Sequence, residues 1–531
     1  MRISAVRLTL LALAAFPAFA QAQQFRSDDQ VIRRMWRLGM DSSHTERLAQ
    51  VLMDSIGPRL SGSPGFESAG QWVERTYQGY GITVRRERYG TWRGWRAGDF
   101  HMTLTAPRTQ VLDVELLSWS MGTPNGRPVD AEVVVIPQLA DAAAASQWLG
   151  TLRGKFVLIS PPEIMCRAPQ ELERLAKPAT VQRVNQRRTE SQQQFNARFR
   201  ALMPSNATPQ QGGRAVISRL DSAGVVGVGS LNWSQGWGVN KIFAAQSERV
   251  PSFDISCEDY GLLHRLASNN QGPRIRFTAE SQATPQEVPM FNIVAEIKGT
   301  EKPNEYVMLS AHLDSWAGAT GATDNGTGTI MMLEAMRILK EAYPRPKRTI
   351  LVGHWGGEEQ GTLGSRSFAE DHPDVIAGLQ ALFNQDNGTW RAEYLEASGF
   401  AKAGANLAKW WGQLPGDLTD SVRFAAPGGQ INMGSDHTSF ICRPAPAFRF
   451  QSHYAEYRQY TWHTNRDTYD KIVFDDLKNN ATIAAMMVYA ASEDPEKTPR
   501  DQSILPPGPN GQPRPWVGCG KAARSFAQPA Q

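Results

Sequence analysis

The chain reads Tyr306-Val307-Met308-Leu309-Ser310-Ala311-His312-Leu313-Asp314 in its second half, a near-continuous apolar run that ends in a histidine and an aspartate. Runs of this kind are typical of strands that are buried on both faces of a sheet. Similar runs occur at residues 291–297, 349–354 and 381–383, and residues 329–343 have the apolar spacing of an amphipathic helix. This alternation predicts an α/β fold, in which helices cover both faces of a mixed, largely parallel sheet.

Several polar side chains lie where such a fold places its ligands. His312, Glu358-Glu359 and Asp386 each follow a predicted strand, and open α/β sheets bind ligands at the carboxyl ends of their strands. Asp324 lies in a loop before the predicted helix, where a helix-capping turn alone would also explain it. His463 lies in a later polar segment. Carboxylates with only two imidazoles suit a pair of hard-to-borderline cations, whereas one structural zinc would favour cysteine and histidine.

Neighbouring carboxylates suggest supporting roles. Asp314 lies two residues beyond His312 and so faces the same side of an extended segment, where it can support the imidazole or hold the adjoining loop. Glu358 and Glu359 would repel one another without cations, and one can bind metal while the other faces a substrate water. Asp467 is the expected partner of His463. We interpret the remaining histidines as structural or surface residues: His44, His101, His264, His354, His372 and His453.

Composition narrows the class of protein. The chain has 531 residues, 41% of them hydrophobic, with a formal net charge of +4. This length fits two or three domains, and the absence of a dense Lys/Arg run argues against nucleic-acid binding. Four cysteines lie far apart in the sequence, at positions 166, 257, 442 and 519. We expect buried thiols or one structural disulfide, because the spacing does not rank the pairings.

The N-terminus has the features of a secretory signal. Arg2 and Arg7 precede an apolar run that ends at Phe19, and Ala18-Phe19-Ala20 places small residues at a cleavage site. The run is short of the ~20 residues that a membrane span needs, which disfavours an uncleaved anchor. We expect cleavage after Ala20 or Ala22, no stable membrane anchor, and a periplasmic or secreted mature protein.

The middle of the chain differs from its second half. Short β-branched runs at residues 130–137, 155–160, 225–231 and 250–255 predict a small, β-rich domain. Within it, residues 170–202 form a polar, Arg- and Gln-rich helical stretch, which we interpret as a solvated surface helix rather than a lid.

The motifs together resemble the di-zinc aminopeptidase family that includes bacterial leucyl aminopeptidases and carboxypeptidase Q-like enzymes. The resemblance covers most of the chain between about residues 40 and 490, and the middle segment resembles a protease-associated domain at residues 154–159 and 223–228. The matching motifs are Ile56-Gly57-Pro58-Arg59-Leu60-Ser61-Gly62-Ser63, His312-Leu313-Asp314, Asp324-Asn325-Gly326, Glu358-Glu359, Asp386, Ser435-Asp436-His437 and His463-Thr464-Asn465-Arg466-Asp467-Thr468.

The resemblance implies two Zn²⁺ ions and a role for each site residue. Asp324 would bridge the ions, His312 and Asp386 would complete one site, and Glu359 and His463 the other. Glu358 would be the general base. Residues expected to support the ligands are Asp314, Asp436, His437 and Asp467. The family also suggests a cis peptide bond between Asp324 and Asn325.

One departure concerns the oxyanion. Family members often carry a tyrosine just before the Ser-Asp-His motif, whereas residues 430–434 here are Gln-Ile-Asn-Met-Gly. Tyr454, Tyr457 and Tyr460 are nearby candidates for this role.

The resemblance implies a zinc-dependent exopeptidase that hydrolyses a peptide substrate near a chain terminus, as an aminopeptidase or a carboxypeptidase Q-like dipeptidase. A dipeptidase or carboxypeptidase would need a cation for the terminal carboxylate, and the sequence does not select among Arg443, Arg449, Arg458 and Arg466. One alternative is a di-zinc N-acyl amino acid deacylase. A second is a non-catalytic binding protein on the same scaffold, of the kind that the transferrin receptor resembles, and a third is a one-metal glutaminyl cyclase relative. The ligand set could also take cobalt or manganese in vitro.

The expected domain organisation follows from these segments. It comprises a signal peptide at 1–20, a peptidase domain in two parts at 41–118 and 285–495, a protease-associated-like insertion at 119–284, and an extended tail at 496–531.

Overall fold

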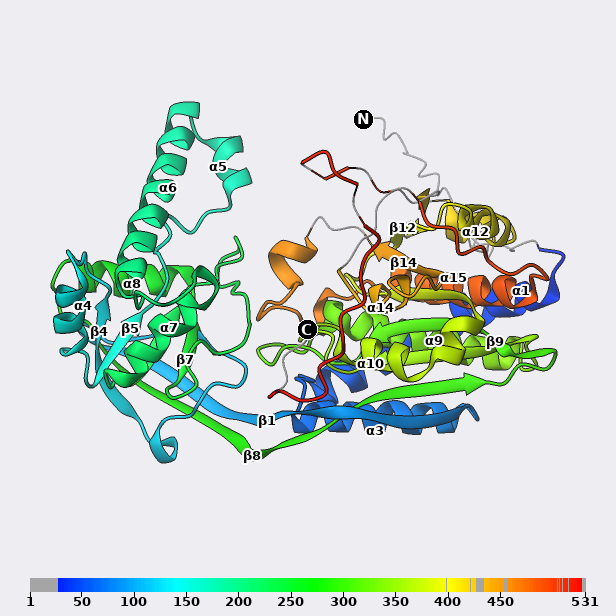
Figure 1. Cartoon of the computed structure of the whole chain (residues 1–531), viewed down its shortest axis with the longest axis horizontal. Helices are drawn as coiled ribbons and strands as arrows, with labels where there is room; N and C mark the ends of the chain where they lie inside the picture. The colour runs from blue at the N-terminus through cyan, green and yellow to red at the C-terminus, as the bar shows by residue number, and fades with distance from the viewer. Residues whose placement is uncertain are drawn as a thin grey trace, which may run out of the picture.

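The computed structural model has two lobes joined by a long two-stranded ribbon (Figure 1). It describes residues 27–397, 399–420, 422–425, 434–452, 456–503, 505, 507–508, 510–513 and 515–527. The predicted signal segment lies outside these residues. None of the helices in the described part of the chain combines the length and apolar character that a membrane span requires.

The larger lobe contains the predicted mixed sheet. Its strand order is β13-β12-β14-β11-β9-β10-β8, with β1 paired to the outer side of β8. The pairs β10–β9, β9–β11 and β11–β14 are parallel, and β8 joins β10 in antiparallel fashion. The strands are β8 (Arg274–Ile297), β9 (Lys302–His312), β10 (Arg348–Trp355), β11 (Leu379–Gln385), β12 (Ala392–Glu396), β13 (Arg423–Ala425) and β14 (Ala447–Ser452).

Helices flank this sheet on both faces, as predicted. α9 (Thr327–Ala342) and α15 (Phe474–Glu493) pack against each other and against β9 and β10, whereas α3 (Pro64–Gly79) and α10 (Leu363–Asp371) contact β1 and β8. α3 begins where Ser63 accepts the Phe66 N–H and Pro64 fixes the first turn. The other helices of the lobe are α1 (Gln30–Trp36), α2 (Thr45–Gln50), α11 (Pro373–Gly378), α12 (Ala403–Trp411), α13 (Gly416–Thr419) and α14 (Thr438–Ile441).

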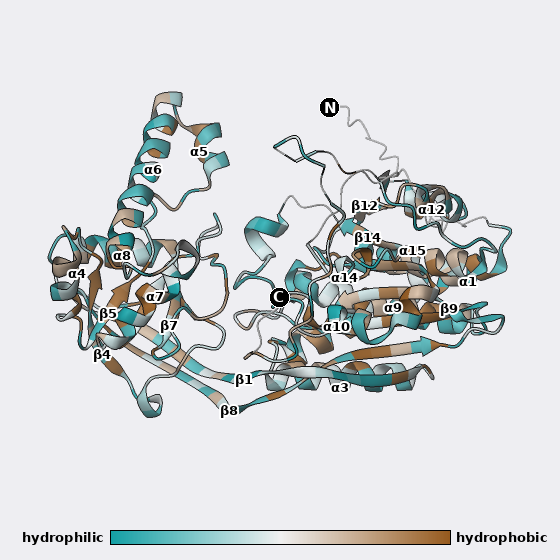
Figure 2. Ribbon diagram, viewed as in Figure 1, coloured by the Kyte–Doolittle hydropathy of each residue, from teal (hydrophilic) through white to brown (hydrophobic). Residues whose placement is uncertain are grey.

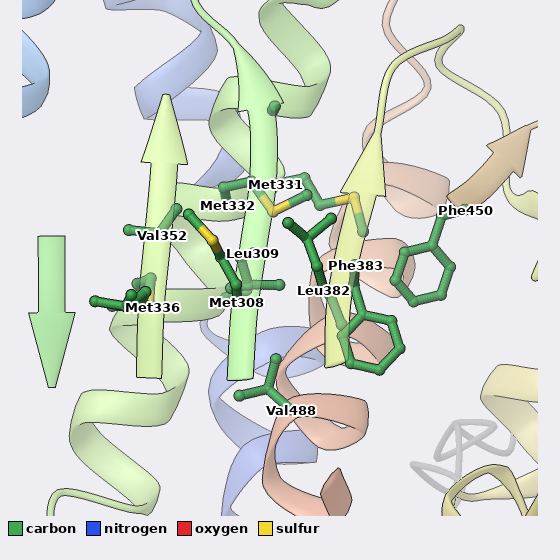
Figure 3. Close-up of a cluster of buried hydrophobic side chains, with 14 of the residues drawn as sticks. Met308, Leu309, Met331, Met332, Met336, Val352, Leu382, Phe383, Phe450 and Val488 are labelled. Atoms are coloured by element: carbon green, nitrogen blue, oxygen red, sulfur yellow. The ribbon is translucent and has the colours of Figure 1, made fainter. Parts of the chain in front are cut away.

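The core of this lobe lies between the central strands and the α9–α15 layer. Leu309 of β9 and Leu382 of β11 are fully buried, and Met332 and Met336 of α9 pack in the same cluster (Figure 3). The predicted apolar face of residues 329–343 is therefore buried, although α9 is buried on nearly every side.

The smaller lobe continues the same sheet through β4-β5-β6-β7-β3. β4, β5, β6 and β7 are parallel, and helices surround them, so the lobe is less purely β-rich than the sequence suggests. Its strands are β2 (Gln110–Val111), β3 (Val114–Leu116), β4 (Val129–Val135), β5 (Lys155–Leu158), β6 (Gly227–Ser230) and β7 (Ser252–Ile255), and its helices are α4 (Ala142–Leu149), α5 (Pro169–Leu175), α6 (Pro178–Ala201), α7 (Pro209–Ser222) and α8 (Cys257–Ser268).

Two long strands connect the lobes. β1 (Thr83–Ala106) pairs with β8 along almost its whole length, with register shifts near Arg88, Arg93 and Ala97. β8 runs without interruption through residues 284 and 285, where the sequence suggested a domain boundary. The chain therefore passes between lobes within strands, not through a loop.

The predicted helical stretch at 170–202 consists of two helices, α5 and α6. Pro178 ends the continuity, because a proline disfavours helical geometry in the residue before it and suits the first turn of a new helix. Val184 is the buried residue of α6. Both helices are largely hydrophilic in Figure 2, whereas apolar residues concentrate in the strands.

The cysteines form two disulfides, not the single bridge that we expected at most. Cys166 pairs with Cys257 in the smaller lobe, and Cys442 pairs with Cys519 of the tail. Disulfides are typical of proteins that leave the reducing cytoplasm. The described part of the tail is irregular and packs on the larger lobe, where Arg524 pairs with Asp371 and the backbone oxygen of Arg524 accepts the Thr91 N–H.

Candidate metal centre

The predicted ligands lie at one edge of the large sheet. His312 is the last residue of β9, Asp386 follows β11 directly, and Glu358 and Glu359 lie shortly after β10. Because β9, β10 and β11 are mutually parallel, their carboxyl ends meet at the same edge. The predicted strand-end placement is therefore confirmed for these four residues.

Asp324 lies between the two histidines. Its Oδ1 is 3.4 Å from His312 Nε2, and its Oδ2 is 3.1 Å from His463 Nε2. On the first side, Asp386 Oδ1 lies 3.0 Å from His312 Nε2. On the second side, Glu359 Oε2 lies 2.8 Å from His463 Nε2. One carboxylate thus faces two neighbouring clusters with different oxygens.

The donor atoms fit metal ions. One cluster joins His312, Glu358 and Asp386 and the other joins Asp324, Glu359 and His463, with the donor atoms of each within 4.8 Å of one another. Two ligand atoms at 2.0–2.1 Å from a tetrahedral zinc lie about 3.3 Å apart, close to the separations observed here. Glu359 Oε1 is buried with no hydrogen-bond donor in the described part of the chain. These features give two neighbouring groups of side chains that could each hold a metal ion, with Asp324 close to both histidines.

Burial and mutual repulsion set the protonation of these groups. Burial alone would raise the pKa of Asp324, but hydrogen bonds to His312 and His463 outweigh it and hold that pKa below its usual value. Burial raises the pKa of Glu359 to about 7, against the effect of His463. Burial also holds the pKa of Glu358 well above its usual value, with Asp386 adding to the shift. Several buried carboxylates so close together favour cations or protons between them.

Asp314 holds the loop that carries both glutamates. Its Oδ1 accepts the backbone N–H of Glu358 at 3.1 Å, and its Oδ2 accepts that of Glu359 at 3.3 Å. His312 Nδ1 is 3.0 Å from the backbone oxygen of Asp314, closer than to its carboxylate at 3.7 Å. Of the two roles open from the sequence, the carboxylate therefore takes the loop, and the backbone supports the imidazole.

Asp467 supports a different ligand from the one expected. Its carboxylate accepts the backbone N–H groups of Thr323 at 2.8 Å and Asp324 at 3.0 Å. It therefore fixes the Asp324 loop, and the expected pairing with the His463 imidazole does not appear. The Asp324–Asn325 peptide bond is cis, as the resemblance implies.

The Ser435-Asp436-His437 segment is buried beside the first cluster. Ser435 accepts a hydrogen bond from Asn384 Nδ2 at 3.0 Å, and Asn384 Oδ1 accepts one from Ser310 of β9. Burial raises the pKa of Asp436 to about 7, with His312 opposing the shift. His437 is also fully buried. These contacts tie the segment to the strand ends without making it part of either cluster.

Two site residues escaped the sequence interpretation. Arg59 is fully buried, and its guanidinium donates to the backbone oxygens of Leu313, Thr320 and Gly321 at 2.6–2.9 Å. It thereby fixes the loop between His312 and Asp324. Trp316 Nε1 donates to Glu359 Oε2 at 2.9 Å. The Ile56–Ser63 motif contained the signal for Arg59, whereas nothing in the sequence pointed to Trp316.

A cavity of about 590 Å³ lies next to the loops around His463. Two of the three tyrosine candidates can be placed: Tyr457 and Tyr460 line this cavity, while Tyr454 and residues 430–433 lie outside the described residues. Its lining combines aromatic rings with charges of both signs, including Glu456, Arg466, Asp470 and Lys471.

The four arginines near the last motif have separate surroundings. Arg443 donates to the backbone oxygen of Ser439, and Arg449 donates to that of Asp386. The Arg458 guanidinium lies 4.8 Å from the Trp462 ring centroid. Among the four, Arg466 lines the cavity and also donates to the backbone oxygen of Gly238 at 3.1 Å.

Known proteins are similar to this chain in sequence. The model of peptidase family M28 matches residues 292–488. Carboxypeptidase Q of Rattus norvegicus is 27% identical over 456 residues, which cover 86% of each chain. Carboxypeptidase Q of Homo sapiens is 28% identical over 360 residues, or 68% of each chain.

Solved structures agree on the fold. A peptidase M28 precursor from Shewanella amazonensis aligns over 90% of this chain and 98% of its own with a TM-score of 0.62 at 22% identity. A zinc aminopeptidase from Bacillus subtilis aligns over 86% of this chain and 97% of its own with a TM-score of 0.53 at 18% identity. Family match, relatives and site point the same way: residues 292–488 match peptidase family M28, most of the chain is similar to carboxypeptidase Q, and the chain is a metallo-exopeptidase.

Proposed function

We propose that the chain is a di-zinc exopeptidase in which Asp324 would be a ligand shared by the two ions. His312 and Asp386 would complete one site, and Glu359 and His463 the other. The observation that carries this proposal is the position of Asp324, whose two oxygens face different histidines. The donor set also suits cobalt or manganese, and the likeness to a structure described as a zinc aminopeptidase favours zinc.

Glu358 is the proposed general base. Its backbone is fixed by Asp314, and its carboxylate lies beside His312 and Asp386, so it would be held next to the bound ions. Bound zinc ions would lower the pKa of an attacking water and polarise the scissile carbonyl. Glu358 would accept a proton from that water and deliver it to the leaving amine, and burial raises the pKa of its carboxyl, which favours accepting a proton.

The proposed substrate is a short peptide with charged ends, cleaved near a terminus. The relatives that align over most of their length are named carboxypeptidase Q, which favours a substrate with a free carboxylate. The cavity beside the His463 loop supports the same class, because Arg466 and Lys471 can pair with a carboxylate while Glu456 and Asp470 can pair with an amine.

A substrate panel tests this proposal. The zinc-loaded protein would be assayed with free dipeptides, amino-blocked dipeptides, aminoacyl anilides and N-acyl amino acids. We expect free dipeptides to have the highest kcat/KM. Preference for anilides would instead indicate an aminopeptidase, and preference for N-acyl amino acids a deacylase. A zinc-loaded protein that hydrolyses none of the four classes would contradict the enzymatic assignment and favour a binding protein.

The domain and compartment assignments belong to the same proposal. We propose that residues 1–20 are a secretory signal, which the two disulfides of the mature chain support, and that the mature enzyme is periplasmic or secreted. We also propose that the smaller lobe, within residues 119–284, is a protease-associated-like insertion. Protein sequencing of the mature N-terminus tests the first point, with a new terminus at Gln21 or Gln23 expected.

A further inference from the structure

The smaller lobe reaches across to the loop that carries His463. Residues 238–243, here called the bridging segment, run beside residues 461–466 of the larger lobe. The Ile242 N–H donates to the His463 backbone oxygen at 2.7 Å. The Asn240 N–H donates to Asn465 Oδ1 at 3.0 Å, and the Asn465 N–H returns a bond to the Asn240 backbone oxygen at 3.0 Å. The backbone of His463 is thus hydrogen-bonded to a different lobe.

Lys241 of the bridging segment adds a charged contact. Its Nζ donates to the backbone oxygens of Arg458, at 2.6 Å, and of Trp462. The same ammonium lies 4.5 Å from the Trp462 ring centroid. A hydrogen bond from a charged donor is stronger than one from a neutral group. Lys241 therefore fastens the turn that leads directly into His463.

Aromatic rings surround the His463 imidazole. The Phe243 ring meets it edge-on with centroids 5.4 Å apart, the Trp316 ring lies 5.9 Å away, and the Trp462 ring stacks at 3.9 Å. Phe243 also packs edge-on against Trp316 at 5.7 Å, and Trp316 donates to Glu359. Phe243 thus touches both the ligand His463 and the residue that orients Glu359.

His463 needs such support, because its backbone is left-handed, with φ at 52°. Residues other than glycine rarely adopt this conformation, and they keep it only where the surrounding structure holds them. Within the described residues, these contacts from the smaller lobe fall on the cluster of Asp324, Glu359 and His463, and none is made to His312 or Asp386.

We propose that the smaller lobe is a structural part of one of the two zinc sites. Phe243 and Lys241 act as positioning residues for His463 and, through Trp316, for Glu359, so occupancy of that site depends on the bridging segment. The site of His312 and Asp386 is built by the larger lobe alone. This inference rests on the di-zinc proposal above.

The test measures zinc binding to the full-length mature protein. Zinc per chain would be determined at a series of buffered free-zinc concentrations for the wild type, Phe243→Ala and Lys241→Met. Phe195→Ala is the matched control, because Phe195 is a half-buried ring of the same lobe that packs on Phe199. Phe243→Tyr keeps the ring and serves as the conservative variant, and His463→Ala defines the affinity of the remaining site.

We expect the wild type, Phe195→Ala and Phe243→Tyr to bind two zinc ions with the same affinities. Phe243→Ala and Lys241→Met should retain one site with the affinity seen in His463→Ala, and bind the second ion about 10- to 100-fold more weakly, as is usual when a residue orienting a ligand is lost. Unchanged affinities in both variants, equal weakening of both sites, or the same selective loss in Phe195→Ala would overturn the inference. A wild type that binds fewer than two ions would instead contradict the proposed function.

Discussion

The two carboxylate oxygens of Asp324 face different histidines, His312 and His463, which lie near opposite ends of the matched segment 292–488. The Asp324 backbone is fixed independently, since Asp467 accepts the N–H groups of Thr323 and Asp324. Glu358 and Glu359 are fixed in the same way by Asp314. The centre is thus built from carboxylates whose main chains are held by further carboxylates, an arrangement that preorganises the ligands before any cation arrives.

Glu358→Gln separates the proposed base from the ligands. The amide keeps the size of the side chain but cannot accept a proton from water. We expect two zinc ions per chain and a turnover lowered by roughly 10²-fold or more, in line with general-base contributions. Glu190→Gln on the exposed helix α6 is the control. A variant with full zinc content and near-normal kcat would refute the role of Glu358.

Asp467→Asn tests the support of the bridging ligand. The substitution replaces one acceptor oxygen with an amide group that faces a backbone N–H, so Asp324 loses a contact without being changed itself. We expect zinc affinity or kcat/KM to fall by about 10- to 100-fold, measured by zinc competition and initial rates. Asp475→Asn, at a side chain that is 85% exposed, should behave as the wild type. Equal values for both variants would contradict this role.

At this scale, the sequence predicted which residues meet and missed how they are held. The positions of His312 and Asp386 at strand ends predicted them as ligands, because a buried apolar run followed by a polar residue has few other interpretations. The sequence did not reveal that Asp467 accepts hydrogen bonds from the Asp324 loop rather than pairing with His463, because this contact depends on how a distant loop folds back. Trp316 and Phe243 carried no signal, because aromatic residues at such spacings are usually core.

The central strands and helix α9 form the framework that holds the site. β9 delivers His312, and its side chains fill the layer between the sheet and helices α9 and α15 (Figure 3). The helix α9 begins directly after the Asp324 loop, and Thr329 donates to the His312 backbone oxygen at 2.9 Å. Packing of this layer therefore also fixes the ligand loops.

Leu309→Ala should destabilise this framework. Leu309 is fully buried at the centre of the sheet, so truncation removes apolar contacts and leaves a cavity. We expect the free energy of unfolding to fall by about 2–5 kcal/mol, measured by urea denaturation. Leu175→Ala, at a residue that is 67% exposed, should change it by less than about 0.5 kcal/mol. A similar change in both variants would show that the β9 layer is not the core of the lobe.

The contact between His372 and Glu87 predicts a pH dependence. His372, after helix α10, lies 3.0 Å from Glu87 of β1, and this hydrogen bond raises the pKa of His372. Burial would raise the pKa of Glu87, but His372 and Arg85 outweigh it and lower that pKa. The charged histidine stabilises the folded state fully below its unfolded pKa of about 6.5, and this stabilisation is lost as pH rises through its folded pKa. The charged glutamate stabilises the folded state fully above its unfolded pKa of about 4.3, and this stabilisation is lost as pH falls through its folded pKa.

The pair should therefore stabilise most between about pH 5 and 6.5. We expect His372→Gln to lower the free energy of unfolding at pH 6 and to change it little at pH 9, measured by urea denaturation at both values. His101→Gln, at an exposed histidine, is the control. A destabilisation by His372→Gln that is as large at pH 9 as at pH 6 would contradict the ion pair.

The sequence predicted helices and strands correctly where the apolar periodicity was strong, but it did not predict the lengths of the strands. The buried runs at 306–311 and 349–354 became β9 and β10. β8 is far longer than the predicted run at 291–297, because residues 280–289 are exposed or half-buried and give no apolar signal. That stretch pairs with β1, and the beginning of β8 joins the apolar core of the smaller lobe through Ile275, Phe277 and Ala279. The order of strands in the sheet depends on pairings between distant segments, which local patterns do not encode.

The paired strands β1 and β8 and the bridging segment join the two lobes of the molecule, and the C-terminal tail packs on the larger lobe. The tail is bound to α14 by the Cys442–Cys519 disulfide and meets β1 through Arg524 (Figure 1). The lobes therefore share one sheet, and one zinc site of the proposed pair contacts both. The sequence indicated an insertion from its composition, but gave no sign that the insertion supports the metal centre.

The zinc content of the wild-type protein shows whether two ions bind around Asp324. The mature protein would be stripped with a chelator, re-equilibrated at buffered free zinc, and analysed by elemental mass spectrometry against protein concentration. The shared position of Asp324 predicts saturation at two zinc ions per chain, with turnover rising as the second ion binds. Saturation at one ion per chain, or full turnover without bound metal, would contradict the di-zinc account.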